Sequence, residues 1–277
     1  MGFLDGKVAF ISGAARGQGR SHALRLASLG ADIVGIDICH DIPTMNYPNA
    51  SVADLEQTVS DVKALGRRML AVQADVRDGA AVQAAVDQGY AEFGRLDIVL
   101  SNAGIVRLGD DPGDRGYGIW QDTLQTNLTG GFHVVWATVP KLIEGGRGGV
   151  IILTGSTAGV RPVGNYSAST LSYTASKWGL VGIGKQLAAA LAEHSIRVNV
   201  IHPTGVASGM TMNAAMAQLM EQAAASGDNT ISAMQNALPV DILQPGDISD
   251  AVEFLVSDKA KWITGVSLPV DAGFSIR

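Results

Sequence analysis

Cysteine is almost absent from this chain: Cys39 is the single one among 277 residues. One thiol cannot form an internal disulfide framework, and it excludes a metal site built from several cysteines. Charged residues are also scarce, at 17% against about 25% in average proteins. The formal charge is −6 and no basic stripe offsets it, so we expect no nucleic-acid partner.

Long hydrophobic runs are missing as well. No apolar run approaches the ~20 residues of a membrane-spanning helix, and the opening MGFLDGKVAFISG lacks the basic-then-apolar plan of a signal peptide. The sequence therefore predicts a soluble, cytoplasmic, globular protein with no membrane partner. The shortage of charge has two explanations, a compact acidic monomer or an oligomer that covers part of its surface, and we favour the oligomer.

Short β-rich runs alternate along the chain with longer helical patterns. The runs that predict strands are Val8–Ser12, Asp32–Asp37, Met69–Ala74, Ile98–Ser101, Val150–Thr154, Val198–His202 and Val266–Val270. The helical patterns lie near 18–29, 54–65, 79–93, 119–143, 172–193 and 247–257. This alternation is typical of a parallel sheet covered on both faces. We therefore predict a single α/β domain over 1–277, a Rossmann-type doubly wound parallel sheet of about seven strands with helices on both faces.

Two stretches interrupt the alternation. Residues 38–52 form a long insertion after the second predicted strand, with two prolines. Residues 203–245 follow the sixth predicted strand and are rich in Met, Ala, Gln and Asn. Connections of this length in a compact domain are usually functional or mobile, and we predict a substrate lid over about 204–240.

A glycine-rich turn, Ser12-Gly13-Ala14-Ala15-Arg16-Gly17-Gln18-Gly19, lies directly between the first predicted strand and the first predicted helix. Glycines let the backbone turn sharply and approach a pyrophosphate, whose charge is met by free N–H groups at the helix start. Asp37 ends the second strand 18 residues after Gly19, the distance at which a carboxylate accepts hydrogen bonds from a ribose 2′-hydroxyl. The pattern predicts a bound dinucleotide.

Asp37 also indicates which dinucleotide is bound. A carboxylate would repel the 2′-phosphate of NADP, and Ile38 and Cys39 follow Asp37 where a basic residue would be needed. Arg16 opposes this reading, because a cation in the glycine turn could reach a phosphate. We predict NAD.

Tyr173 and Lys177 stand four residues apart in a strongly helical segment, so both side chains lie on one helix face. A free tyrosine has a pKa near 10, which is too high for a general base at neutral pH. A nearby lysine cation and an oxidised nicotinamide would both lower the pKa of Tyr173. Such a pair alone is usually a solvated helix face, but after a dinucleotide turn it predicts acid–base chemistry on an alcohol or carbonyl.

These motifs together resemble the short-chain dehydrogenase/reductase family over nearly the whole chain. The glycine turn is similar to the family's TGxxxGxG pattern with Ser12 first, Asp75-Val76 to its adenine-contacting pair, and Ser101-Asn102-Ala103-Gly104 to its NNAG segment. Asn127 resembles the asparagine that anchors a proton-relay water, and Ser156 the catalytic serine. Pro203-Thr204-Gly205-Val206 resembles the turn beside the nicotinamide, with Thr204 inserted.

The resemblance thus implies a set of site residues. The catalytic ones are Ser156, Tyr173, Lys177 and Asn127. The cofactor-binding ones are Gly13, Arg16, Gly17, Gln18, Gly19, Asp37, Ile38, Asp75, Val76, Asn102, Ala103, Gly104, Tyr173, Lys177, Pro203, Gly205, Val206 and Ser208. No metal site is expected, since no His/Cys/Asp cluster is visible in the sequence.

The sequence also departs from the family pattern. Ser156 and Tyr173 are 17 residues apart, a few more than is usual, and Ser208 replaces a common threonine. The insertion 38–52 and His202-Pro203-Thr204-Gly205-Val206 resemble the carveol-dehydrogenase-like, mycofactocin-associated branch. That likeness implies a secondary alcohol such as a terpenoid, a NAD that is held rather than exchanged, and an external redox carrier such as mycofactocin. The alternative for the insertion is a surface loop without function.

The expected reaction is the reversible oxidation of a secondary alcohol to its ketone. Tyr173 takes the hydroxyl proton, Ser156 bonds the developing alkoxide, Lys177 supports the tyrosine and Asn127 continues the proton path. The family resemblance also implies a homotetramer in which the 119–143 and 172–193 helices pair across subunits. Two alternatives stay open, an NADPH-dependent 3-oxoacyl-type ketoreductase and a non-catalytic dinucleotide-sensing protein. Asp37 opposes the first, and the retained serine, tyrosine and lysine oppose the second.

Overall fold

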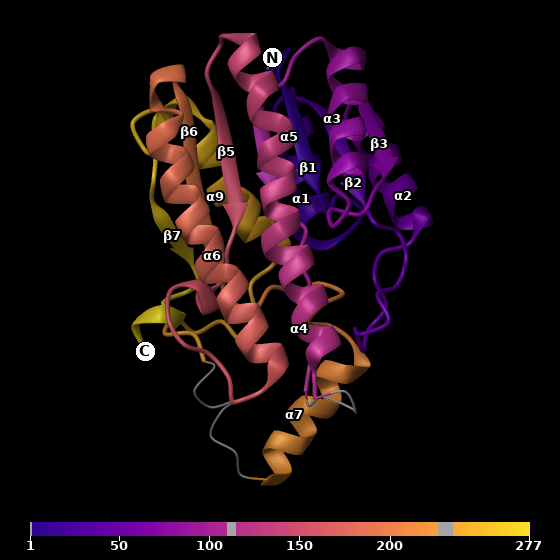
Figure 1. Ribbon diagram of the computed structural model, residues 1–277, viewed down its shortest axis with the longest axis vertical. Coiled ribbons are helices and arrows are strands. Elements are labelled where there is room, and N and C mark those ends of the chain that lie inside the picture. Colours follow the sequence, from indigo (N-terminus) through magenta and orange to yellow (C-terminus); the bar gives the residue numbers. More distant parts are fainter. Residues whose placement is uncertain (1, 110–114, 227–234) are drawn as a thin grey trace.

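A computed structural model of the chain describes residues 2–109, 115–226 and 235–277. Its centre is a parallel sheet with the strand order β3-β2-β1-β4-β5-β6-β7 (Figure 1). The strands are β1 Val8–Ser12, β2 Asp32–Asp37, β3 Met69–Gln73, β4 Ile98–Ser101, β5 Gly149–Thr154, β6 Ile196–Pro203 and β7 Ser267–Val270. The predicted seven-stranded, doubly wound fold is confirmed, and each strand lies within a few residues of its predicted range.

The helices cover both faces of this sheet. They are α1 Gly17–Ser28, α2 Val52–Ala64, α3 Gly79–Phe93, α4 Tyr117–Leu124, α5 Gly130–Gly145, α6 Ala168–Ala190, α7 Ala214–Ser226 and α9 Pro245–Val256. Short 3₁₀ turns occur at η2 Thr157–Gly159, η3 Ala192–His194, η4 Asp258–Ala260 and η5 Phe274–Ile276. No helix within the described residues is long and apolar enough to cross a bilayer.

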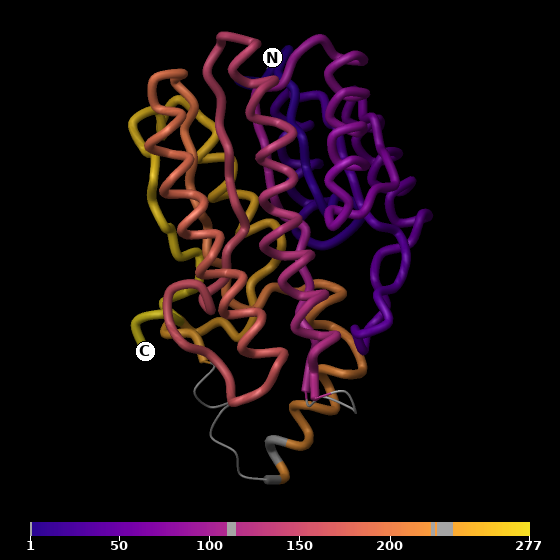
Figure 2. Tube along the Cα trace, in the orientation of Figure 1, coloured from indigo at the N-terminus to yellow at the C-terminus, as the bar shows by residue number. Residues whose placement is uncertain are grey.

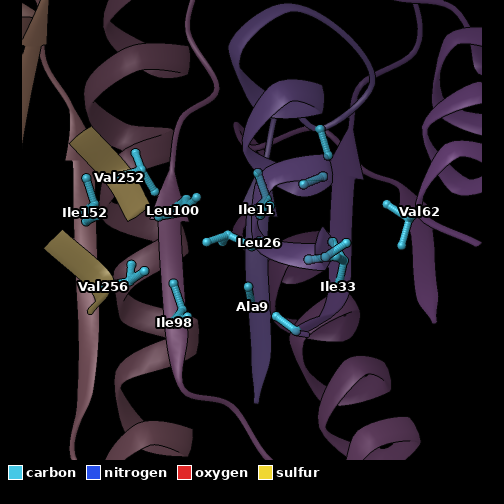
Figure 3. Packing of buried hydrophobic residues seen from close by; sticks show 14 of the residues in the cluster. Ala9, Ile11, Leu26, Ile33, Val62, Ile98, Leu100, Ile152, Val252 and Val256 are labelled. Atoms are coloured by element: carbon cyan, nitrogen blue, oxygen red, sulfur yellow. The ribbon is translucent and has the colours of Figure 1, made fainter. Parts of the chain in front are cut away.

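Strand side chains alternate between two hydrophobic cores because successive residues point to opposite faces of a sheet. Ala9 and Ile11 of β1 pack with α1, α2 and α9, whereas Val8 and Phe10 pack with α3, α5 and α6. Figure 3 shows the first core, where Leu26 of α1 lies against Ile11 and the neighbouring strands. Both faces of each central strand are therefore buried, which explains the continuous apolar runs in the sequence.

The strand order reverses between β1 and β4, and this places a crevice beyond the carboxyl ends of these two strands. Open α/β sheets bind their ligands at this kind of switch point. The chain from 38 to 52 runs along the same end of the molecule, as does α7 from the 203–245 stretch (Figure 2). Residues 227–234 fall in the predicted lid, and they lie outside the described residues, as do residues 110–114.

One predicted helix is not continuous. The pattern over 119–143 predicts a single helix, but the structure has α4, then a π-helical turn η1 at Gln125–Thr129, then α5. The residue at the centre of that turn is Asn127, whose side chain bonds a loop outside the helix. Single π turns of this kind are frequent at functional sites, and hydrophobic periodicity alone does not show them.

Candidate active site

The glycine turn between β1 and α1 leaves no room for side chains. A Cβ on Gly19 would lie 1.9 Å from the Gly13 carbonyl oxygen. Gly13 has a φ of +70°, and a Cβ on it would lie 3.0 Å from the Ala103 Cα. Ser12 closes the turn from below, because its hydroxyl accepts the amides of Asn102 and Ala103 at 3.0 and 3.1 Å. The predicted Ser12 and Asn102 motifs are thus joined, and the N-terminus of α1 stays open to a ligand.

Seven of the predicted cofactor residues line one cavity of about 80 Å³ beside this turn. They are Gly13, Asp37, Ile38, Asp75, Val76, Ala103 and Gly104. The same cavity is lined by Ile42 and Asn49 of the 38–52 insertion and by Thr126, which sequence reasoning did not single out. The Thr126 hydroxyl and the Gln18 side-chain oxygen are buried without a protein partner, as expected of polar groups that a ligand can satisfy. These residues fit a dinucleotide.

Asp37 ends β2 at the edge of the cavity and is 8% exposed. Its carboxylate accepts the Ala15 amide of the glycine turn at 2.9 Å, and burial raises the pKa of this acid. Arg16, which could have bound a 2′-phosphate, instead donates to the Pro48 carbonyl of the insertion at 2.7 Å. The carboxylate therefore faces the cavity while the nearby cation is engaged elsewhere.

Asp75 also lines the cavity and belongs to a network of ion pairs. Arg77 bonds the Asp75 carboxylate at 2.7 Å and the Asp122 carboxylate of α4 at 2.9 Å. These paired carboxylates raise the pKa of the Arg77 guanidinium. These ion pairs hold in place the segment after β3 that carries the predicted adenine contact, Asp75-Val76.

Tyr173 and Lys177 occupy successive turns of α6, and the lysine ammonium lies 5.4 Å from the centroid of the tyrosine ring. Lys177 is 3% exposed and donates from Nζ to the Thr154 carbonyl at the end of β5, at 2.8 Å. A Cβ on Gly104 would lie 3.5 Å from the same Nζ, so the ammonium faces the cofactor segment. Ser156 follows Thr154 by two residues, and its side chain lies near enough to the Tyr173 phenol to lower the pKa of that group. The predicted serine, tyrosine and lysine are therefore together.

The pKa of Tyr173 differs from the sequence expectation. Burial raises the pKa of this phenol, and the nearby Ser156 side chain only partly opposes the rise. Burial also lowers the pKa of Lys177 to about 8, because a buried ammonium loses its hydration. The residues alone thus hold the tyrosine as a phenol, and further positive charge is needed to favour the phenolate.

Asn127 is buried and bonds the loop that follows Gly104. Its side-chain oxygen accepts the Ile105 amide at 2.8 Å and its nitrogen donates to the Ile105 carbonyl at 2.9 Å. The same nitrogen reaches the Ser176 hydroxyl at 3.3 Å. The predicted relay residue therefore joins the Ile105 loop to the helix that carries Tyr173 and Lys177.

The segment after β6 places the last predicted cofactor residues. Val206 is buried and pairs with Leu243, whose amide donates to the Gly205 carbonyl at 3.0 Å. A Cβ on Gly17 would lie 3.3 Å from the Ser208 Cβ. The 203–208 turn thus passes beside the start of α1, close to the glycine turn.

His202 was not among the predicted site residues, yet its ring lies behind the serine. Its Nδ1 is 2.7 Å from the Ser156 carbonyl oxygen and 3.3 Å from the Ser156 amide nitrogen. Gly155 makes room for this ring, since a Cβ there would lie 2.6 Å from Nδ1. Burial lowers the pKa of His202, and a ring protonated at Nδ1 donates to the serine carbonyl. The contact joins residues 46 apart in sequence, which no local pattern reveals.

Comparison with known proteins identifies the family to which this chain belongs. Residues 7–219 match the family model described as short chain dehydrogenase. The chain belongs to the short-chain dehydrogenase family. Among the described residues, no group of three or more His, Cys, Asp or Glu is placed to hold a metal ion.

Similar proteins are also known individually. The chain is 40% identical over 281 residues to (-)-trans-carveol dehydrogenase of Rhodococcus erythropolis, with 100% of both chains covered. It resembles the crystal structure of carveol dehydrogenase from Mycobacterium avium in complex with NAD, with a TM-score of 0.92, 46% identity and complete coverage of both chains. A short chain dehydrogenase from Mycobacterium paratuberculosis bound to NAD gives a TM-score of 0.93 at 40% identity, also with complete coverage. The predicted carveol-dehydrogenase likeness is confirmed.

The buried Lys177 makes stability depend on pH. Its pKa falls from 10.5 to about 8 on folding, so between these values the unfolded chain holds more protons and the free energy of unfolding rises with pH. We expect cofactor-free wild-type protein to gain up to about 1.4 kcal/mol per pH unit in this window relative to Lys177→Met. Urea denaturation at pH 7.5, 8.5 and 9.5 measures the difference, and parallel curves for the two proteins would contradict it.

Replacing His202 should impair catalysis more than stability. His202→Leu removes the donor behind Ser156, and we expect kcat to fall about tenfold to a hundredfold, the effect of a small misplacement of a reacting group. His202→Asn keeps a nitrogen donor near the Nδ1 position and should recover most of kcat.

His22→Leu is the matched control for this experiment. His22 is equally buried, bonds Ser249 through Nδ1 and also leaves Nε2 without a partner, but it lies between α1 and α9. We expect this variant to lose stability and keep its kcat. Equal kcat losses in His22→Leu and His202→Leu would show that His202 acts only through folding.

Proposed function

We propose that this protein is an NAD-dependent dehydrogenase that interconverts a secondary alcohol and its ketone, with Tyr173 as the acid–base group. The observation that carries the proposal is the meeting of Ser156, Tyr173 and Lys177 beside the glycine-turn cavity that Asp37 closes. Family membership supports the reaction class, and the NAD-bound structural relatives support the cofactor.

The side chains divide the work. Ser156 donates its hydroxyl to the substrate oxygen, where negative charge develops in the transition state. Tyr173 accepts the alcohol proton and returns it in the reverse direction. A bound NAD would supply the hydride acceptor and, in its oxidised form, positive charge that favours the Tyr173 phenolate. Lys177 adds a second cation on the same side, and Asn127 holds the Ile105 loop against α6 along the proton path to solvent.

The proposed substrate is a secondary alcohol with an apolar body, such as a terpenoid. The carveol dehydrogenase of Rhodococcus erythropolis supports this class. The apolar content of the 204–240 lid, with Met212 and Met220 exposed on or near α7, agrees with an apolar ligand. Methionine side chains adapt to ligands of irregular shape.

We further propose that NAD is held rather than freely exchanged. Ile42 and Asn49 of the insertion line the cavity beside Asp37 together with the predicted cofactor residues, so the insertion forms part of the cofactor site. The Arg16–Pro48 bond fastens the insertion to the glycine turn, and Asn49 stabilises the insertion internally through bonds to His40 and Asp41. Entry or exit of the cofactor requires this segment to move. Reoxidation of a held cofactor needs an external redox carrier such as mycofactocin.

We also propose a homotetramer built on the α4–α5–α6 layer. Seven large apolar side chains on these helices are exposed, namely Tyr117, Trp120, Phe132, Trp136, Ile143, Leu171 and Trp178. Trp136 is 71% exposed and stacks on Phe132 with a centroid distance of 5.3 Å. Exposed patches of this kind mark interaction surfaces. Leu180 of α6 and Leu191, the residue that follows this helix, are by contrast buried within the protomer's own core.

Replacing Tyr173 tests the reaction. Tyr173→Phe removes the acid–base group while keeping the ring, and we expect alcohol oxidation to fall at least about a hundredfold, the contribution of general acid–base catalysis. Bound NAD, measured in the denatured supernatant, should stay at the wild-type level. The assay supplies trans-carveol with either free NAD or an artificial electron acceptor.

Tyr166→Phe is the control, since that tyrosine is 95% exposed and should not affect turnover. Retained activity in Tyr173→Phe would overturn the role of Tyr173. Faster turnover with free NAD than with the artificial acceptor, or purification without NAD, would overturn the held-cofactor proposal.

A charge on the exposed aromatic face should disrupt the assembly. Trp136→Glu places a carboxylate in the proposed interface, where an unpaired buried charge is costly, and we expect light scattering to show species smaller than a tetramer. Leu65→Glu, at the end of α2 on the other face of the sheet, is 45% exposed before substitution and should stay tetrameric. A monomeric wild-type protein would contradict the proposal.

A further inference from the structure

The loop after Gly104 has little structure of its own, and side chains from elsewhere bind its backbone. Asn127 binds both polar groups of Ile105. The Ser169 hydroxyl of α6 donates to the Arg107 carbonyl at 2.6 Å. Since backbone polar groups need partners when they leave water, these side chains decide where residues 105–108 lie.

The 38–52 insertion supplies the remaining contacts to this loop. The Val106 amide donates to the Tyr47 hydroxyl at 3.3 Å. The Asn46 amide group binds both polar groups of Leu108, donating to its carbonyl at 2.6 Å and accepting its amide at 3.2 Å. Arg107 in turn donates to the Thr44 carbonyl at 2.8 Å. Three residues of the insertion therefore meet three consecutive residues of the loop.

An apolar cluster lies beside these hydrogen bonds. Ile42 and Met45 of the insertion and Ile105 of the loop are buried together, with Ile38 against them. Tyr47 is 7% exposed, so its ring fills a closed space while its hydroxyl reaches the loop. The insertion and the loop thus form one packed unit rather than two independent surface segments.

This unit borders the catalytic groups. The loop leaves Gly104, where a Cβ would lie 3.5 Å from the Lys177 ammonium. Ser169, which holds the Arg107 carbonyl, lies one helical turn before Tyr173 on α6. Burial raises the pKa of Tyr47 to about 12, and the nearby Tyr173 phenol contributes to the rise. The two tyrosines therefore lie close enough to interact electrostatically.

We infer that the insertion positions the 105–108 loop as a wall of the alcohol pocket, through Tyr47 and Asn46, and so sets alcohol affinity and selectivity. This role rests on the proposed alcohol dehydrogenase function and is distinct from covering the cofactor. Tyr47 and Asn46 are positioning residues, since they act through the loop backbone.

Ile42 serves both roles, since it lines the cofactor cavity and packs against Ile105 of the loop, but the polar residues of the insertion divide between them. Asn46 points to the loop, whereas Asn49 lines the cofactor cavity and bonds within the insertion, donating to the His40 carbonyl at 3.1 Å. Thr44 adds a link toward the cofactor side, because its hydroxyl donates to Asp122 at 2.6 Å and Asp122 pairs with Arg77. Substitutions at Asn46 and Asn49 can therefore separate the two roles.

Kinetics with secondary alcohols of increasing size test the inference. We expect Tyr47→Phe and Asn46→Ala each to raise the KM for trans-carveol about fivefold, roughly the effect of one lost hydrogen bond, with kcat within about twofold and bound NAD unchanged. The KM for 2-propanol should change less, so selectivity for the large alcohol falls. Asn49→Ala, the matched contrast, removes a side-chain bond within the insertion and none to the loop, so it should lower bound NAD and leave amide exchange at 105–109 at the wild-type rate.

Amide hydrogen exchange gives a second, activity-independent test. Peptides that cover 105–109 should exchange faster in Tyr47→Phe and Asn46→Ala, while those over β2 and β3 should not change. Unchanged exchange at 105–109, or unchanged KM values, would overturn the inference, as would loss of NAD in step with the KM increase. Wild-type protein that oxidises no alcohol would defeat the proposed function instead, and the exchange result would still decide whether the insertion holds the loop.

Discussion

The hydrogen bond from the Lys177 ammonium to the Thr154 carbonyl holds the candidate site together. Thr154 is the last residue of β5, where the ladder of strand hydrogen bonds ends and its carbonyl needs another partner. Lys177 satisfies it from α6 at 2.8 Å and thereby ties that helix to the end of the strand. Ser156 follows the strand by two residues and Tyr173 precedes the lysine by one helical turn, so this one bond brings both groups together. The buried cation weakens the fold at neutral pH, the kind of stability cost that functional sites commonly carry.

The same edge of the sheet also requires that backbone approach backbone. Gly19 and Gly13 can come together because neither carries a side chain, and Asn102 bonds the carbonyls of Ser12 and Gly13 at 3.0 and 3.3 Å. The segment after β4 thus binds the turn after β1, and it can do so because β1 and β4 are neighbouring strands in the sheet. The strand order brings these two turns together, and the glycines allow them to approach closely at the start of α1.

Sequence reasoning succeeded where the controlling interactions are local or periodic. Strands buried on both faces read as apolar runs, and the four-residue spacing of Tyr173 and Lys177 places both on one helix face. It did not foresee the π turn at Asn127, because bonds to Ile105, 22 residues away, determine that geometry. His202 escaped notice for the same reason, and so did the bonds of Tyr47 and Asn46, which span 59 and 62 residues. The pKa of Tyr173 is raised because the side chain is buried, and the spacing of residues in the sequence does not show how deeply a side chain is buried.

Chemistry and selectivity depend on different parts of this chain. Ser156, Tyr173 and Lys177 are held by β5 and α6, whose positions follow from the sheet and its two cores. The 105–108 loop is held instead by side chains from the 38–52 insertion, by Asn127 and by Ser169. Changes in the insertion can therefore move the wall of the pocket while the reacting groups stay in place. A protein arranged in this way can accept new alcohols through substitutions in one surface segment, provided that the Asn127 and Ser169 bonds keep the loop attached to the catalytic helix.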